Sequence, residues 1–146
     1  MVYFLTKVLY YVEEKKGNAM KYFVLMTFAA LLLIAGCGGQ VNPEKLKQAN
    51  ALVDEGSYEE GIETLDGLAQ SNAGDEALKQ SRISAHMKYA HFLMMNDTLP
   101  PRVKYPKALK HYRVVLQLDP NNKNAQDNAN QIIEIYKMMG REVPNV

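Results

Sequence analysis

The stretch YPKALKHYRVVLQLDPN, residues 105–121, decides the fold that we expect for this chain. Its apolar and aromatic side chains recur every three or four residues, a spacing that places them on one face of an α-helix. Ala108 is small enough to let a second helix approach closely, and Pro120 ends the helix and turns the chain. The stretch therefore predicts one helix of a tightly packed helix pair.

An earlier segment, residues 58–68, has the same spacing. Its sequence, YEEGIETLDGL, aligns with residues 105–115 and again has a small residue, Gly61, three positions after a tyrosine. Tyr58 corresponds to Tyr105, so the copies lie 47 residues apart and leave room for another helix between them. The chain therefore contains an internal repeat of helix pairs.

This repeat resembles the tetratricopeptide repeat (TPR), whose second helix has tyrosine, small, aromatic, small and proline positions at fixed intervals. The later copy fills these positions in order with Tyr105, Ala108, Tyr112, Val115 and Pro120. The earlier copy is weaker, because Ala73 stands where the family has proline. The resemblance covers about residues 42–139 and implies an all-α superhelix of two helix pairs plus a C-terminal capping helix. An unrelated helical bundle is the alternative.

Start and stop signals divide this region into five expected helices. They run from Asn42 to Gly56, from Tyr58 to Asn72, from about Asp75 to Met95, from Tyr105 to Asp119 and from Asn122 to Gly140. The third has two apolar faces, so we expect it to be buried on two sides. No segment alternates like a strand, which favours one helical domain over residues 42–140 with a tail at 141–146.

Residues 22–35, YFVLMTFAALLLIA, contain no charged side chain. A membrane span needs about 20 apolar residues, whereas this run has the length typical of a signal peptide. It ends in Ile34-Ala35-Gly36-Cys37, which resembles the lipobox of bacterial lipoproteins. The resemblance implies diacylglycerol on the Cys37 thiol, cleavage after Gly36, and fatty acids such as palmitate as a stable membrane anchor.

The first nineteen residues fit this leader poorly, because Glu13 and Glu14 lie where a basic segment is expected. The EEKKG string that precedes Met20 requires purine-rich codons, as a ribosome-binding site would. We therefore interpret residues 1–19 as a start-site misassignment, with an extended leader as the alternative. Residues 20–36 form the expected signal peptide, and residues 37–41 form a lipidated tether.

The sequence shows no catalytic or metal-binding pattern. The single cysteine is assigned to lipid, and the three histidines, His86, His91 and His111, lack the spacing of a metal motif. We expect these histidines at the surface or in a groove rather than as ligands. The net charge of +1 argues against nucleic-acid binding. We therefore expect no enzyme, no cofactor and no metal site.

The TPR resemblance implies that a protein partner binds in a groove lined by the first helix of each pair. The expected groove residues are Asn50, Lys88, His91 and Gln131. Some family members grip a terminal carboxylate with a lysine four residues before an asparagine. Leu46 occupies that position before Asn50, so no C-terminal carboxylate ligand is implied.

Charge is distributed unevenly along the helices. Residues 42–78 hold nine acids and two bases, whereas residues 79–123 hold nine bases and two acids. The two halves attract each other, or the charges keep the outer faces soluble, or the bases form a patch for an acidic partner or anionic lipid headgroups. The expected basic patch comprises Arg102, Lys104, Lys107, Lys110 and Arg113.

These observations predict a membrane-anchored TPR-like lipoprotein that acts as an interaction scaffold or adaptor in the cell envelope. Gly38, rather than aspartate, follows Cys37. In bacteria with two membranes this favours the outer membrane, facing the periplasm. The alternative is a self-associating, pilotin-like assembly factor for a secretion or pilus complex. Two helix pairs and one closing helix are fewer than the three repeats that bury a continuous core. We therefore expect a homodimer or a partner-stabilised monomer.

Cys37→Ser is expected to leave an uncleaved, unlipidated precursor, because a hydroxyl is a far weaker nucleophile than a thiolate. Incorporation of labelled palmitate measures the difference between the variant and the wild type. Equal labelling of the two proteins would contradict the lipobox interpretation.

Overall fold

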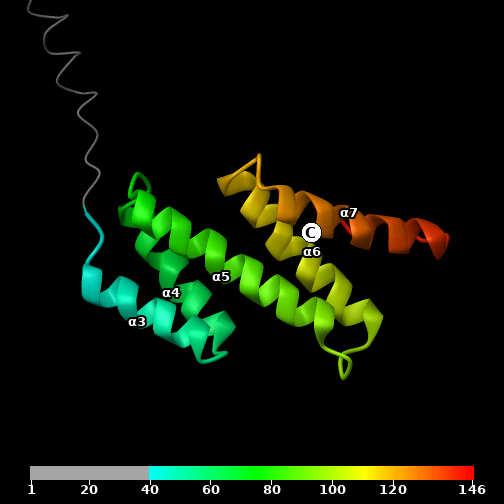
Figure 1. The fold of residues 1–146 in the computed structure, drawn as a ribbon, viewed down its shortest axis with the longest axis horizontal. Helices are drawn as coiled ribbons and strands as arrows, with labels where there is room; N and C mark the ends of the chain where they lie inside the picture. Colours follow the sequence, from blue (N-terminus) through cyan, green and yellow to red (C-terminus); the bar gives the residue numbers. More distant parts are fainter. Residues whose placement is uncertain (1–39) are drawn as a thin grey trace, which may run out of the picture. The chain divides into compact units, whose positions relative to one another are not determined.

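A computed structural model describes residues 40–146 of the chain (Figure 1). This part is all-α, as predicted, with no strand among the described residues. Its helices are α3 (Pro43–Asp54), α4 (Tyr58–Ser71), α5 (Glu76–Met95), α6 (Pro101–Leu118) and α7 (Lys123–Met138). None of them is both long and apolar enough to cross a membrane. The leader and the lipobox, including Cys37, lie outside the described residues.

Side-chain caps fix the starts of three helices. Asn42, Asp75 and Asn122 each accept a hydrogen bond from a backbone N–H in the first turn of α3, α5 and α7. Such bonds satisfy N–H groups that have no partner within the helix. All three residues are predicted as helix starts from the sequence, and the structure confirms them.

The fourth helix starts earlier than the sequence predicts. The sequence indicates a loop up to Lys104, but α6 begins at Pro101 and contains Pro106 near its second turn. The N–H groups of Val103 and Lys104 already donate to the carbonyl oxygen of Pro100, at 2.8 and 3.1 Å. Pro101 suits a first turn because its φ is fixed and its missing N–H is not needed there.

The helices pack largely in chain order around α5. α3 packs on α4 and α5, α4 on α5, α5 on α6, and α6 on α7. In Figure 1, α5 lies between the α3–α4 pair and the α6–α7 pair. Its buried residues, as expected for a helix covered on two sides, are Leu78, Ile83, Ala85, His86, Tyr89, Ala90, Leu93 and Met94. The superhelical arrangement stays a prediction.

The two small residues of the repeat, Gly61 and Ala108, are both buried. Ala108 has no exposed surface. A Cβ atom added to Gly61 would lie 2.5 Å from Val53 Cγ2 and 3.0 Å from the carbonyl oxygen of Ala49. α3 and α4 therefore meet at Gly61, as the resemblance of the first copy to a helix pair implies.

The folded part begins at Val41 rather than at Asn42. Val41, which the sequence assigns to the tether, is buried, and its N–H donates to Asp75 Oδ2 at 3.0 Å. Asp75 Oδ1 accepts from the N–H of Leu78 at 2.9 Å. The backbone hydrogen bonds from Leu78 and Val41 lower the pKa of Asp75. One carboxylate thus caps α5 and holds the incoming chain.

Gly61→Ala is expected to destabilise the fold by about 1–3 kcal/mol, because the new methyl group overlaps a β-branched side chain and a backbone oxygen. Gly67→Ala, on the same helix, meets nothing within 4 Å and is expected to stabilise the fold by about 0.5–1 kcal/mol. Chemical denaturation of both variants measures the difference. Equal effects would show that α3 and α4 do not meet at Gly61.

Candidate functional site

The structure brings three of the four expected groove residues to one side of α5. Asn50 and Lys88 line a hollow of about 380 Å³ between α3 and α5, where Asn50 Nδ2 donates to Ser81 Oγ at 3.1 Å. Lys88 and His91 line a neighbouring hollow of about 400 Å³ near the end of α5. Gln131 is exposed on α7 and lines neither hollow.

The second hollow, which we call the α5 groove, exposes large apolar side chains. It is lined by Tyr58, Lys88, His91, Phe92, Met95 and Asn96. Phe92 is 44% exposed and Met95 61% exposed. The Phe92 ring packs on the Tyr58 ring with centroids 5.1 Å apart. The groove thus presents an aromatic and thioether surface beside two basic side chains.

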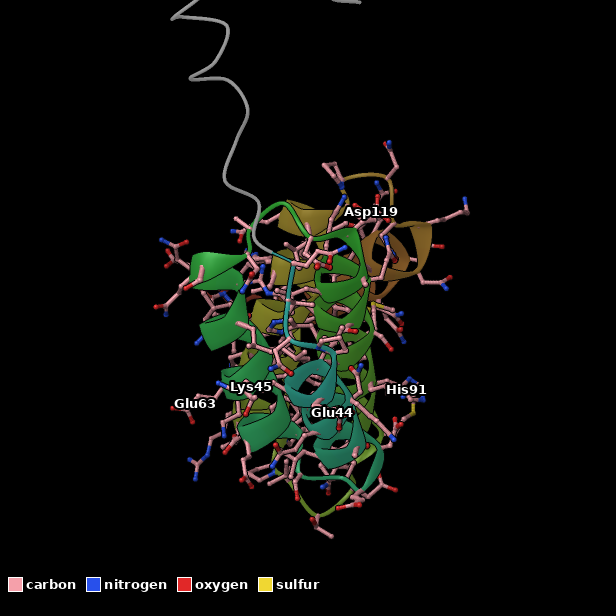
Figure 2. All side chains as sticks on the ribbon, turned by 90° about the vertical axis from the view of Figure 1, so that its left-hand side faces the viewer. Glu44, Lys45, Glu63, His91 and Asp119 are labelled. Atoms are coloured by element: carbon pink, nitrogen blue, oxygen red, sulfur yellow. The ribbon has the colours of Figure 1, made fainter. Side chains whose placement is uncertain are left out.

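A third hollow, of about 640 Å³ and here called the polar cleft, is lined by residues of α4, α5 and α6. Its polar lining includes Glu59, Glu63, Asp66, Tyr89, Lys107, Lys110 and His111. Figure 2 shows Glu63 of this cleft and His91 of the α5 groove projecting on opposite sides of the helices. The two candidate sites therefore present different faces.

Tyr89 and Glu59 form the central contact of the polar cleft. The Tyr89 hydroxyl donates to Glu59 Oε1 at 2.6 Å, and Lys107 Nζ lies 3.7 Å from the same oxygen. The Tyr89 hydrogen bond and the Lys107 charge lower the pKa of Glu59. Burial and the neighbouring carboxylate raise the pKa of Tyr89 to about 12. Tyr89 therefore acts as a hydrogen-bond donor at neutral pH.

Asp66 links this cleft to the core. Arg82 Nε donates to Asp66 Oδ1 at 2.7 Å, and His86 Nε2 lies 3.8 Å from the same oxygen. The neighbouring His86 ring and then Arg82 lower the pKa of Asp66. Asp66 is thus an ionised carboxylate that faces two basic groups of α5.

The expectation of surface histidines is wrong for His86. Its side chain is buried, and its Nδ1 atom lies 2.8 Å from Nδ1 of His111. Burial, followed by the charges of His86 and Lys110, lowers the pKa of His111 to about 4. His91 is exposed, as expected. The one local signal for His86 is its place between Ile83 and Ala90 on an apolar helix face.

The five predicted basic residues do not form one free surface. Lys104 is buried, and its Nζ donates to the carbonyl oxygen of Asn96 at 3.1 Å, near the end of α5. Arg113 is half-buried and donates to the carbonyl oxygens of Pro144 and Val146, at 3.1 and 2.8 Å. Because Lys104 and Arg113 make these hydrogen bonds within the chain, they are not free to bind a lipid headgroup.

The remaining bases are divided between structural and solvent-exposed positions. Lys107 pairs with Glu59, whereas Arg102 and Lys110 are exposed and make no ion pair within residues 40–146. The contacts between charged or titratable side chains that join different helix pairs all connect an acid of α3 or α4 with a side chain of α5 or α6. They are Arg82–Asp66, His86–Asp66, Lys88–Asp54 and Lys107–Glu59. Part of the uneven charge thus acts within the fold, through Asp54, Glu59 and Asp66.

Across residues 40–146, no group of three or more His, Cys, Asp or Glu side chains could hold a metal ion. No protein-family model matches the chain, and comparison with curated proteins and with solved structures finds no match either. Functional inference therefore depends on the lipobox, the α5 groove and the polar cleft.

Tyr89→Phe is expected to lower the thermal midpoint, because it removes the hydroxyl that donates a part-buried hydrogen bond to Glu59 but keeps the ring. Tyr58→Phe is the matched control. The Tyr58 ring stacks on the Tyr89 ring with centroids 5.3 Å apart, but the Tyr58 hydroxyl makes no hydrogen bond to the described residues. Thermal unfolding of both variants measures the effect. A Tyr58 variant that is as destabilised as the Tyr89 variant would contradict this assignment.

Proposed function

We propose that this protein is a membrane-anchored lipoprotein whose TPR-like helical domain binds another protein in the cell envelope, without catalysis. The sequence Ile34-Ala35-Gly36-Cys37 supports the anchor, and the repeat supports the type of domain. The observation that carries the binding function is the exposure of Phe92 and Met95 side by side in the α5 groove.

The composition of the groove defines the partner segment that fits it. Aromatic side chains dominate the energetics of protein interfaces, and methionine adapts its shape to different apolar groups. Lys88 and His91 lie beside this surface. Lys88 pairs with Asp54, but both side chains are at least half exposed, so another carboxylate can replace Asp54 at little cost. The favoured partner is a peptide segment with an apolar anchor and a neighbouring acidic residue.

The anchor restricts where binding takes place. Only Gly38, Gly39 and Gln40 separate Cys37 from the buried residue Val41. Four residues span at most about 14 Å when fully extended. A lipid on Cys37 would therefore keep Val41 close to the bilayer surface, and the partner would be a membrane protein or an envelope protein that reaches this surface. In a bacterium with two membranes, we assign the protein to the outer membrane, facing the periplasm.

A self-associating assembly factor is the second candidate. Met138 and Met139, at the end of α7, are 80% and 45% exposed. An exposed apolar end on the last helix of a repeat stack is a surface on which a second copy can pack. This candidate predicts a homodimer that forms without any other protein.

A photo-crosslinking residue at position 92, in place of Phe92, is expected to give a discrete adduct with one envelope protein in intact cells. Glu63 is the matched control position, since it is exposed and projects on the opposite side (Figure 2). The adduct is expected to weaken at least several-fold when Lys88 and His91 are both changed to glutamate.

Three results distinguish the proposals. An adduct at position 92 that is lost with Cys37→Ser supports a partner at the membrane. An adduct of twice the monomer mass supports self-association instead. Equal labelling at positions 92 and 63, or no adduct at position 92, would contradict a binding function for the α5 groove.

A further inference from the structure

The contact between His86 and His111 requires a particular arrangement of protons. Two Nδ1 atoms 2.8 Å apart can form a hydrogen bond only if one of them carries a proton and the other does not. A neutral imidazole has a single N–H, on either Nδ1 or Nε2. At neutral pH the two rings must therefore be different tautomers.

Asp66 decides which ring donates. His86 Nε2 is buried without a hydrogen-bond partner among the described residues and lies 3.8 Å from Asp66 Oδ1. An N–H at this position is attracted by the carboxylate, whereas a bare lone pair would be repelled by it. His86 therefore carries its proton on Nε2 and accepts at Nδ1, and His111 donates from Nδ1.

This assignment leaves His111 Nε2 as a bare nitrogen. His111 is half-buried, lines the polar cleft, and its Nε2 is not among the buried atoms without a partner. A proton from solvent can reach this atom directly. When it binds there, the shared proton can move from His111 Nδ1 to His86 Nδ1, which places the positive charge next to Asp66 and keeps the Nδ1 contact.

We propose that the His86–His111 pair is an acid-sensitive joint between α5 and α6. The pair accepts one proton from solvent through His111 Nε2 and holds its charge against Asp66. A second proton puts an N–H on both Nδ1 atoms, so the hydrogen bond must break and one tie between α5 and α6 is lost.

The charged groups around the pair act on both sides of this equilibrium. Glu59, Glu63 and Asp66 of α4 favour the added protons, whereas Arg82 of α5 and Lys107 and Lys110 of α6 oppose them. The neutral phenol of Tyr89 packs against His111 with centroids 4.7 Å apart. The lowered pKa of His111 agrees with a second proton that binds only under acidic conditions.

The sign of the effect on stability follows from proton binding. In the unfolded chain His111 titrates near its ordinary value of 6.5, whereas in the folded protein its pKa is about 4. Between these values the unfolded state holds more protons. Stability therefore falls as the pH is lowered from 6.5 towards 4.

The first test follows the thermal midpoint of the full-length chain in detergent micelles between pH 7.5 and 4.5. His111→Phe keeps a ring against Tyr89 but removes the titrating group, and it is expected to lose most of the fall in midpoint seen in the wild type. His91→Gln is the matched control, since it removes an exposed histidine from α5, and it is expected to keep the wild-type fall. An unchanged fall in His111→Phe would overturn the proposal.

The second test needs no variant. The chain has only three histidines, so ¹⁵N-histidine labelling of the full-length protein gives a simple NMR spectrum of ring nitrogens. At pH 7.5 we expect His111 protonated at Nδ1, His86 protonated at Nε2, and a coupling across the Nδ1 contact that disappears below about pH 4. Identical tautomers for His86 and His111 at pH 7.5 would overturn the proposal, as would a coupling that survives at pH 4 with both rings fully protonated.

Discussion

The packing of α5 against helices on two sides is the constraint on which the rest of the fold depends. On the faces that α3, α4 and α6 cover, α5 can hold polar side chains only where a neighbouring helix supplies a partner. Arg82, His86 and Tyr89 lie on α5 under this constraint. Their partners are Asp66 and Glu59 of α4 and His111 of α6. The polar cleft is therefore a consequence of how α5 is buried.

The same constraint explains the distribution of charge. Acids concentrate in α3 and α4 because the bases of α5 and α6 face them, as in the pairs Lys88–Asp54 and Lys107–Glu59. Exposed pairs of this kind add little stability, but opposite charges on facing helices disfavour other pairings of the same helices. Lys104 and Arg113 show that a basic residue in a sequence pattern can equally serve to fix a loop or a chain end.

Local sequence signals predicted the helices well. A cap such as Asn42 depends only on residues within a few positions of it. The close approach at Gly61 depends on one residue that has no side chain. The His86–His111 contact joins residues 25 positions apart, and it exists only because two helices pack in a specific register. The early start of α6 does not follow from the sequence, because Pro101 and Pro106 both suit a first turn and only the fold shows which one occupies it.

Tyr89 connects the two faces of the molecule. Its ring stacks on Tyr58 of the α5 groove and packs against His111, and its hydroxyl bonds to Glu59 in the polar cleft. A partner that binds against Tyr58 therefore contacts a ring that packs on Tyr89, and Tyr89 also packs against His111 of the histidine pair. Coupling between two binding equilibria is reciprocal. If loss of the His86–His111 contact weakens partner binding in the groove, then a bound partner must lower the pH at which the histidine pair takes up its second proton.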